Sequence, residues 1–137
     1  MFSWIGGFIS WTSKLQHAVS SFTADSEYIA GVATTLEALW LRKLMADLGE
    51  PITPVPIAED GQACLALIAN PKGTGRTKHI DVCHHLVRER TEMGEVRFYY
   101  TPGVEVVADG LTNALPGPAS ANFKNGVGMV FLVQSPK

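Results

Sequence analysis

The sequence predicts an α/β fold in which a small mixed sheet is flanked by helices. Two short apolar runs separated by Gly6 and Gly7 indicate a hairpin near the N-terminus. Apolar residues recur at helical spacing over residues 21–50, and residues 95–100 alternate between apolar and polar as a half-buried strand does. With 137 residues, 46% hydrophobic and 18% charged, the chain is expected to form one globular domain.

Taken in order, the hairpin is expected over residues 1–13 and a long helix over residues 21–50. One face of this helix begins at Glu27 and continues with small residues, which would allow close packing against a sheet. A second, bulkier stripe consists of Ile29, Val32, Leu36, Leu39 and Trp40. A helix that is apolar on two sides is usually buried between layers, so Glu27 is expected to lie at the edge of the sheet.

The remaining elements are predicted as a strand at 55–60, helices at 61–69 and 77–93, a strand at 95–100 and a short helix at 106–115. Proline, glycine, serine and asparagine then become frequent. Residues 116–137 are therefore interpreted as an irregular tail that takes no part in the core.

Three carboxylates stand at element boundaries and are the candidate catalytic and metal-binding residues: Glu27, Asp60 and Asp109. Sites in open α/β sheets form at the carboxyl ends of strands, where Asp60 is predicted. Clustered carboxylates repel one another unless cations join them, and two Mg²⁺ ions about 4 Å apart can promote phosphodiester hydrolysis. Each residue alone also fits a structural role, as a helix-dipole partner or an N-cap, and the residue pattern leaves both explanations open.

Basic residues gather in one segment although the net charge is only -2. Residues 72–90 contain five basic and two acidic residues, whereas the rest of the chain contains six basic and eleven acidic residues. This segment is the candidate nucleic-acid contact, and the residues expected to make it are Lys72, Arg76, Lys78, His79 and Arg88. A solvated helix face is the alternative interpretation.

Cysteine usage and hydropathy restrict the cellular setting. Cys64 and Cys83 are too far apart in sequence to suggest a disulfide framework or a zinc knuckle, which favours a reducing compartment, cytoplasmic or nuclear. The apolar runs at residues 1–11 and 129–133 are too short to span a bilayer, so no membrane association is expected.

Six motifs in the chain then carry a family resemblance: ISWTSKLQ (9–16), SFTADSEYIA (21–30), EALWLR (37–42), EDGQA (59–63), RTKHID (76–81) and VADGLT (107–112). In this colinear order, over about residues 1–115, they resemble the ribonuclease H domain of copia-type retrotransposon Pol polyproteins. The resemblance implies a ribonuclease H-like fold and Mg²⁺-dependent cleavage of the RNA strand of an RNA:DNA hybrid. It also implies a reverse transcriptase domain upstream in the parent polyprotein.

By the same resemblance, Glu27, Asp60 and Asp109 match three of the family's four metal-binding carboxylates. The family's first strand, which is central in its sheet and bears the first catalytic Asp, precedes the hairpin, and this sequence has no Asp or Glu before Asp25. Residues 1–115 are therefore expected to form a domain incomplete at its N-terminus, with an impaired two-ion site and impaired cleavage. A non-catalytic nucleic-acid-binding module and a decayed retroelement remnant are the alternatives.

Overall fold

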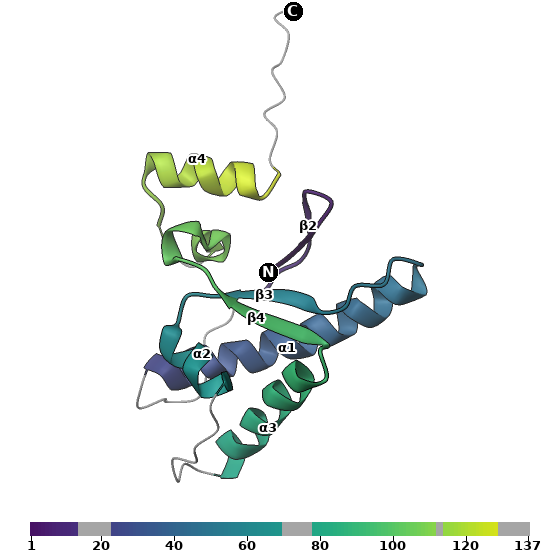
Figure 1. Cartoon of the computed structure of the whole chain (residues 1–137). Coiled ribbons are helices and arrows are strands. Elements are labelled where there is room, and N and C mark those ends of the chain that lie inside the picture. Colours follow the sequence, from purple (N-terminus) through teal and green to yellow (C-terminus); the bar gives the residue numbers. More distant parts are fainter. Residues whose placement is uncertain (14–22, 70–77, 112–113, 129–137) are drawn as a thin grey trace, which may run out of the picture. The chain divides into compact units, whose positions relative to one another are not determined.

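The computed structural model describes residues 1–13, 23–69, 78–111 and 114–128 (Figure 1). These residues contain four α-helices, four short strands and two 3-10 helices, so the predicted α/β class is confirmed. The chain divides into two compact units. The terminal unit consists of residues 1–15 and 103–137, and the central unit consists of residues 16–102.

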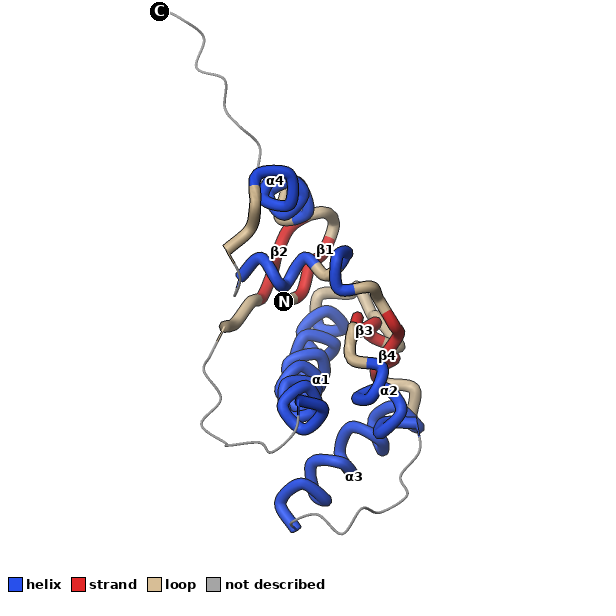
Figure 2. The backbone as a smooth tube through the Cα atoms, turned by 90° about the vertical axis from the view of Figure 1, so that its left-hand side faces the viewer, coloured by secondary structure: helices blue, strands red, loops and turns tan. Residues whose placement is uncertain are grey.

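The central unit is built on a parallel pair of strands, β3 (Val55–Glu59) and β4 (Val96–Tyr100). Val55 is in register with Val96 at one end of the pair, and Glu59 with Tyr100 at the other. Parallel strands need a crossover connection, which the two helices between β3 and β4 supply. Three helices pack on this sheet (Figure 2): α1 (Thr23–Asp47), α2 (Gln62–Ala69) and α3 (Lys78–Glu92).

The core lies between these helices and one face of the sheet. Val55, Ile57 and Val96 are buried because alternate strand residues point toward the helices. A cluster of buried side chains from the helices completes the core: Tyr28, Cys64, Ile68 and Val87. In β4 the alternation predicted for residues 95–100 corresponds to a buried Val96 and an exposed Arg97, whereas Tyr100 at the end of the strand is exposed although it shares the parity of Val96.

The long helix was predicted to be buried on two sides, and this is correct for one side only. Ala38, Leu41 and Met45 are buried as expected for the first face. Leu36 and Trp40, from the bulkier stripe, are 53% and 57% exposed. The reason is that the small two-stranded sheet is too narrow to cover more than one side of a 25-residue helix.

The terminal unit contains an antiparallel hairpin formed by β1 (Phe2–Trp4) and β2 (Gly7–Ser10). The turn residues Ile5 and Gly6 both have positive φ, 47° and 77°, which is the backbone geometry that tight hairpin turns require. The predicted hairpin is confirmed. Among the described strands, β1 and β2 form a sheet of their own, separate from β3 and β4, whereas the sequence predicted one mixed sheet.

The C-terminal elements of the same unit differ from the prediction. Where a helix was expected at 106–115, the described residues form the 3-10 helix η2 (Val107–Leu111), and another 3-10 helix, η1 (Gly103–Glu105), precedes it. The tail expected to be irregular contains the helix α4 (Gly117–Gly126). A Cβ on Gly110 would lie only 2.2 Å from Cδ2 of Phe123, so the Phe123 ring packs directly over this glycine. This tertiary contact stabilises a helix that composition alone did not indicate.

No helix in the described part of the chain is both long enough and apolar enough to cross a membrane.

Candidate acidic site at the end of β3

The carboxyl end of β3 brings Glu59 to the covered side of the sheet. Val55, Ile57 and Glu59 share the same parity along the strand, and Val55 and Ile57 are buried against the helices. The strand ends at Glu59, and α2 begins at Gln62. The Glu59 carboxylate therefore lies where β3 ends and the short connection to α2 begins.

Gly61 makes room for two carboxylates from different elements. A Cβ on this residue would lie 2.2 Å from Oε2 of Glu27 and 2.9 Å from Oε1 of Glu59. The Gly61 N–H donates a hydrogen bond of 3.0 Å to Oε1 of Glu59. Glu27 in the second turn of α1 and Glu59 at the end of β3 can therefore approach each other only because residue 61 has no side chain.

Glu59 lies in surroundings that disfavour its ionised form. Partial burial raises the pKa of the Glu59 carboxyl above its usual value of 4.5, while the hydrogen bond from Gly61 lowers it. The negative charges of Glu27 and Asp60 raise the Glu59 pKa further. The net effect is an increase, so this end of the sheet concentrates negative charge at a cost in free energy.

Cys64 lies in the first turns of α2 and is fully buried in the core. Burial, and then the charges of Glu59 and Glu27, raise the pKa of the Cys64 thiol to about 12. The thiol is therefore protonated at neutral pH and unsuited to nucleophilic chemistry. Its role in the structure is apolar packing beneath the acidic residues.

Of the three predicted site residues, the structure places two, Glu27 and Asp60, at the carboxyl end of β3. Glu27 was expected to cluster with Asp60 and Asp109, and its carboxylate lies against Gly61 and beside Glu59. Asp60 is exposed, directly after the strand, and its charge acts on Glu59. Asp109 lies in η2 of the terminal unit, and its side chain is outside the described residues.

Glu59 is the residue that sequence reasoning missed as a member of the cluster. It was read only as part of a motif next to Asp60. The available signal was strand parity, because Val55 and Ile57 are the large apolar residues of the predicted strand and Glu59 follows at the same spacing. Applying the alternation to the last strand residue would have placed the Glu59 carboxylate on the side of Glu27.

The chemistry of this cluster suits a hard cation, because carboxylate oxygens are the ligands that Mg²⁺ prefers. However, no three or more His, Cys, Asp or Glu side chains within the described residues are arranged to hold a metal ion. Oxygen donors are present, but a complete coordination set is not assembled from the described part of the chain alone.

The predicted nucleic-acid contacts are only partly visible. Lys72 and Arg76 lie outside the described residues. Lys78 and His79 begin α3, but their side chains are not among those described. Arg88 lies later in the same helix, and its Nε donates a hydrogen bond of 3.0 Å to Oε1 of Glu92. The positive charge of Arg88 is therefore balanced within its own helix.

Comparison with known proteins identifies homologues among transposon polyproteins. The chain is 36% identical over 129 residues to the retrovirus-related Pol polyprotein from transposon TNT 1-94 of Nicotiana tabacum, covering 94% of this chain and 10% of that protein. It is 32% identical over 122 residues to the corresponding polyprotein from transposon RE1 of Arabidopsis thaliana, covering 88% of this chain and 8% of the polyprotein. The chain is also 31% identical over 123 residues to the corresponding polyprotein from transposon RE2 of the same plant.

The chain thus spans a tenth or less of the length of these curated relatives. No protein-family model matches the sequence, and no solved structure matches it either.

Proposed function

We propose that this chain, whose homologues are retrovirus-related Pol polyproteins of copia-type transposons, is a ribonuclease H-like domain derived from such a polyprotein. Its chemistry is that of enzymes that hydrolyse the RNA strand of an RNA:DNA hybrid. In a parent polyprotein it would work beside a reverse transcriptase domain. The 137 residues by themselves supply an impaired form of this activity.

The observation that carries the proposal is the meeting of Glu27 and Glu59 over Gly61 at the carboxyl end of a parallel strand. Purely structural carboxylates are normally paired with cations or placed in solvent. Here partial burial, with a further contribution from the charges of Glu27 and Asp60, raises the pKa of Glu59, so the fold holds like charges together. Such a cluster supports binding of a cation, which would relieve the repulsion.

Within this proposal Mg²⁺ would be held by Glu27, Asp60 and Asp109, the three residues that match the family's metal-binding carboxylates. The bound ions would supply an activated water and stabilise the leaving oxygen of the phosphodiester. Glu59 would raise the negative potential around Glu27 without serving as a ligand. Gly61 would keep the space between the two glutamates free.

The expected impairment follows from ligand number. This sequence offers three of the four carboxylates that the resemblance implies, and two-ion sites depend on several ligands to fix two cations about 4 Å apart. With fewer ligands we expect weak Mg²⁺ binding and negligible cleavage by the 137-residue chain.

The test has two arms. Isothermal titration calorimetry of the chain with Mg²⁺ should show weak binding, and this binding should be lost in Glu27→Gln. Incubation with a labelled RNA:DNA hybrid and Mg²⁺ or Mn²⁺ should give negligible product, and fusing a strand with an Asp ahead of Met1 should give metal-dependent cleavage. Asp60→Asn in the fused protein should abolish that cleavage.

Glu50→Gln is the matched control, because Glu50 is an exposed carboxylate just beyond the other end of α1. It should leave metal binding and cleavage unchanged. Mg²⁺ binding that persists in Glu27→Gln, or hybrid cleavage insensitive to both Glu27→Gln and Asp60→Asn, would show that these acids do not form the site.

A further inference from the structure

The outer edge of β4 presents unpaired backbone groups. The Val55 N–H donates to the Glu95 carbonyl, and the Thr101 N–H donates to the Glu59 carbonyl, both at 3.0 Å. In a parallel ladder with this register, residues 97 and 99 direct their backbone groups toward β3. Phe98 and Tyr100 therefore direct theirs outward, and no backbone hydrogen bond joins them there to another described residue.

The two edges of this sheet differ in what they offer an added strand. On β3 the outward-facing residues are Pro56 and Ala58, and Pro56 has no N–H to donate. On β4 both outward-facing residues in the second half of the strand, Phe98 and Tyr100, have a donor and an acceptor. The β4 edge is the one equipped for strand pairing.

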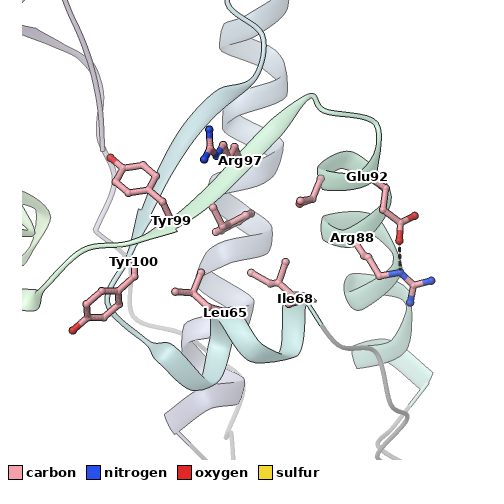
Figure 3. Close-up of a pocket in the computed structure, with 10 residues that line it drawn as sticks. Leu65, Ile68, Arg88, Glu92, Arg97, Tyr99 and Tyr100 are labelled. Atoms are coloured by element: carbon pink, nitrogen blue, oxygen red, sulfur yellow. Dashed lines mark hydrogen bonds and ion pairs between the residues drawn. The ribbon is translucent and has the colours of Figure 1, made fainter.

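A pocket of about 560 Å³ lies along this edge, between β4 and the helices α2 and α3 (Figure 3). Tyr99 and Tyr100 point to opposite sides of the strand, yet both line this one pocket. The pocket must therefore wrap around the strand edge rather than lie on one face of the sheet. Leu65 and Ile68 of α2, together with Phe98, give it an apolar floor.

The rim of the pocket carries a net positive charge. Arg88 and Glu92 pair with each other across one turn of α3. Arg97 is exposed on the other side of β4, and no ion pair joins it to a described residue. Of the charged lining residues, two are arginines and one is a glutamate. An acidic side chain beside Arg97 would complete this arrangement.

We propose that this pocket, the β4 edge groove, binds an extended peptide segment that adds to the sheet as a strand next to β4. Its backbone pairs with Phe98 and Tyr100. Its apolar side chains, two residues apart, rest on Leu65 and Ile68. A carboxylate on the opposite side of the peptide lies beside Arg97.

The shape of the groove favours a single peptide strand over other occupants. Arg88, Thr91 and Glu92 of α3 line the groove beside the edge. We expect this side of the helix to hinder a second whole sheet from pairing with β4. Nucleic acid would require several free cations, whereas one of the two arginines that line the groove, Arg88, is already paired with Glu92.

Fluorescence polarisation tests the proposal with short fluorescein-labelled peptides added to the full chain. The first probe alternates valine with threonine and has one central threonine replaced by glutamate. The second probe has lysine at that position. The wild-type chain should bind the glutamate peptide up to about fivefold more tightly, the range of a cross-strand charge pair, and Arg97→Glu should reverse the preference.

Tyr100→Pro removes the outward N–H while leaving the ladder to β3 intact, and should weaken binding roughly fivefold to tenfold. Tyr100→Ala keeps the N–H and serves as the matched control, with circular dichroism confirming that both variants fold. The proposal is overturned if neither peptide binds, or if Arg97→Glu leaves the preference unchanged. It is also overturned if a single-stranded oligonucleotide occupies the groove in place of the peptides, or if sedimentation shows a dimer that Tyr100→Pro dissociates.

Discussion

The two ends of the β3 and β4 sheet handle charge in opposite ways. At the end where β4 begins, Glu95 accepts a hydrogen bond from Arg42 of α1 and another of 3.1 Å from Arg90 of α3. At the end where β3 finishes, Glu27 and Glu59 meet over Gly61 with no cation from the described residues beside them. One end is neutralised by three elements, and the other accumulates charge of one sign.

This difference separates charge that is paired across elements from like charge that is held together. The ion pairs at Glu95 join α1, α3 and β4, so they contribute to holding the central unit together. The carboxylates at the other end oppose folding through mutual repulsion, which a bound cation would relieve. Variants at the two ends should therefore change stability in opposite directions.

The largest effect on stability is expected from Glu95→Ala. This variant leaves the guanidinium groups of Arg42 and Arg90 partly buried without their shared carboxylate, so the free energy of unfolding should fall by about 2 kcal/mol. Urea denaturation measures it. Glu89→Ala is the control, because Glu89 is exposed and its contact with Arg90 is long, at 3.8 Å. This variant should lower the free energy of unfolding by less than about 0.5 kcal/mol. Equal losses in the two variants would remove the structural half of the comparison.

Glu59→Gln should have the opposite sign. The amide retains an oxygen to accept the Gly61 N–H but carries no charge, so the variant should gain up to about 1 kcal/mol at pH 7. Because the pKa of Glu59 is raised on folding, its ionisation destabilises the wild type above the folded pKa. As pH falls through that value toward 4.5, the wild type protonates and the difference should disappear. Urea denaturation midpoints of both proteins at a series of pH values measure this stability difference. A difference that grows at low pH would refute a raised pKa for Glu59.

Gly61→Ala should produce a smaller loss of stability, about 0.5 kcal/mol, because the new Cβ meets the flexible end of Glu27 rather than backbone. The two carboxylates must move apart, so Mg²⁺ affinity should fall although the chain remains folded. Titration with Mg²⁺ and urea denaturation of the same sample distinguish these effects. Unchanged Mg²⁺ binding would mean that the space over Gly61 is not part of the site.

The last prediction concerns the reactivity of Cys64, where the variant effect is small. In a Cys83→Ser background, iodoacetamide at pH 8 should modify the folded chain roughly a hundredfold more slowly than the urea-unfolded chain, since the thiol is buried with a pKa of about 12. Glu59→Gln should increase the folded-state rate slightly by removing one of the charges that raise this pKa. Mass spectrometry follows the modification. Equal rates in folded and unfolded chains would place Cys64 outside the core.

Local sequence patterns were sufficient to predict most elements of the fold. The alternation in residues 95–100 predicted β4, and the long helical pattern ending at Gly49 predicted α1. These predictions succeeded because each pattern reports on one element and the face that it buries. The surroundings of Glu27 were less accessible to sequence reasoning, which named Asp60 and Asp109 but not Glu59, whose carboxylate lies with that of Glu27 against Gly61.

By itself, the sequence determined the α/β class, the order of the elements from the hairpin to β4 and the position of Asp60 directly after β3. Only the tertiary structure decided that Leu36 and Trp40 remain exposed, that Phe123 packs over Gly110 to support α4, and that the outer edge of β4 borders a pocket. Each of these outcomes depends on which distant segment covers a given surface. Periodicity along one element contains no information about its neighbour, so such features become visible only when the elements are packed together.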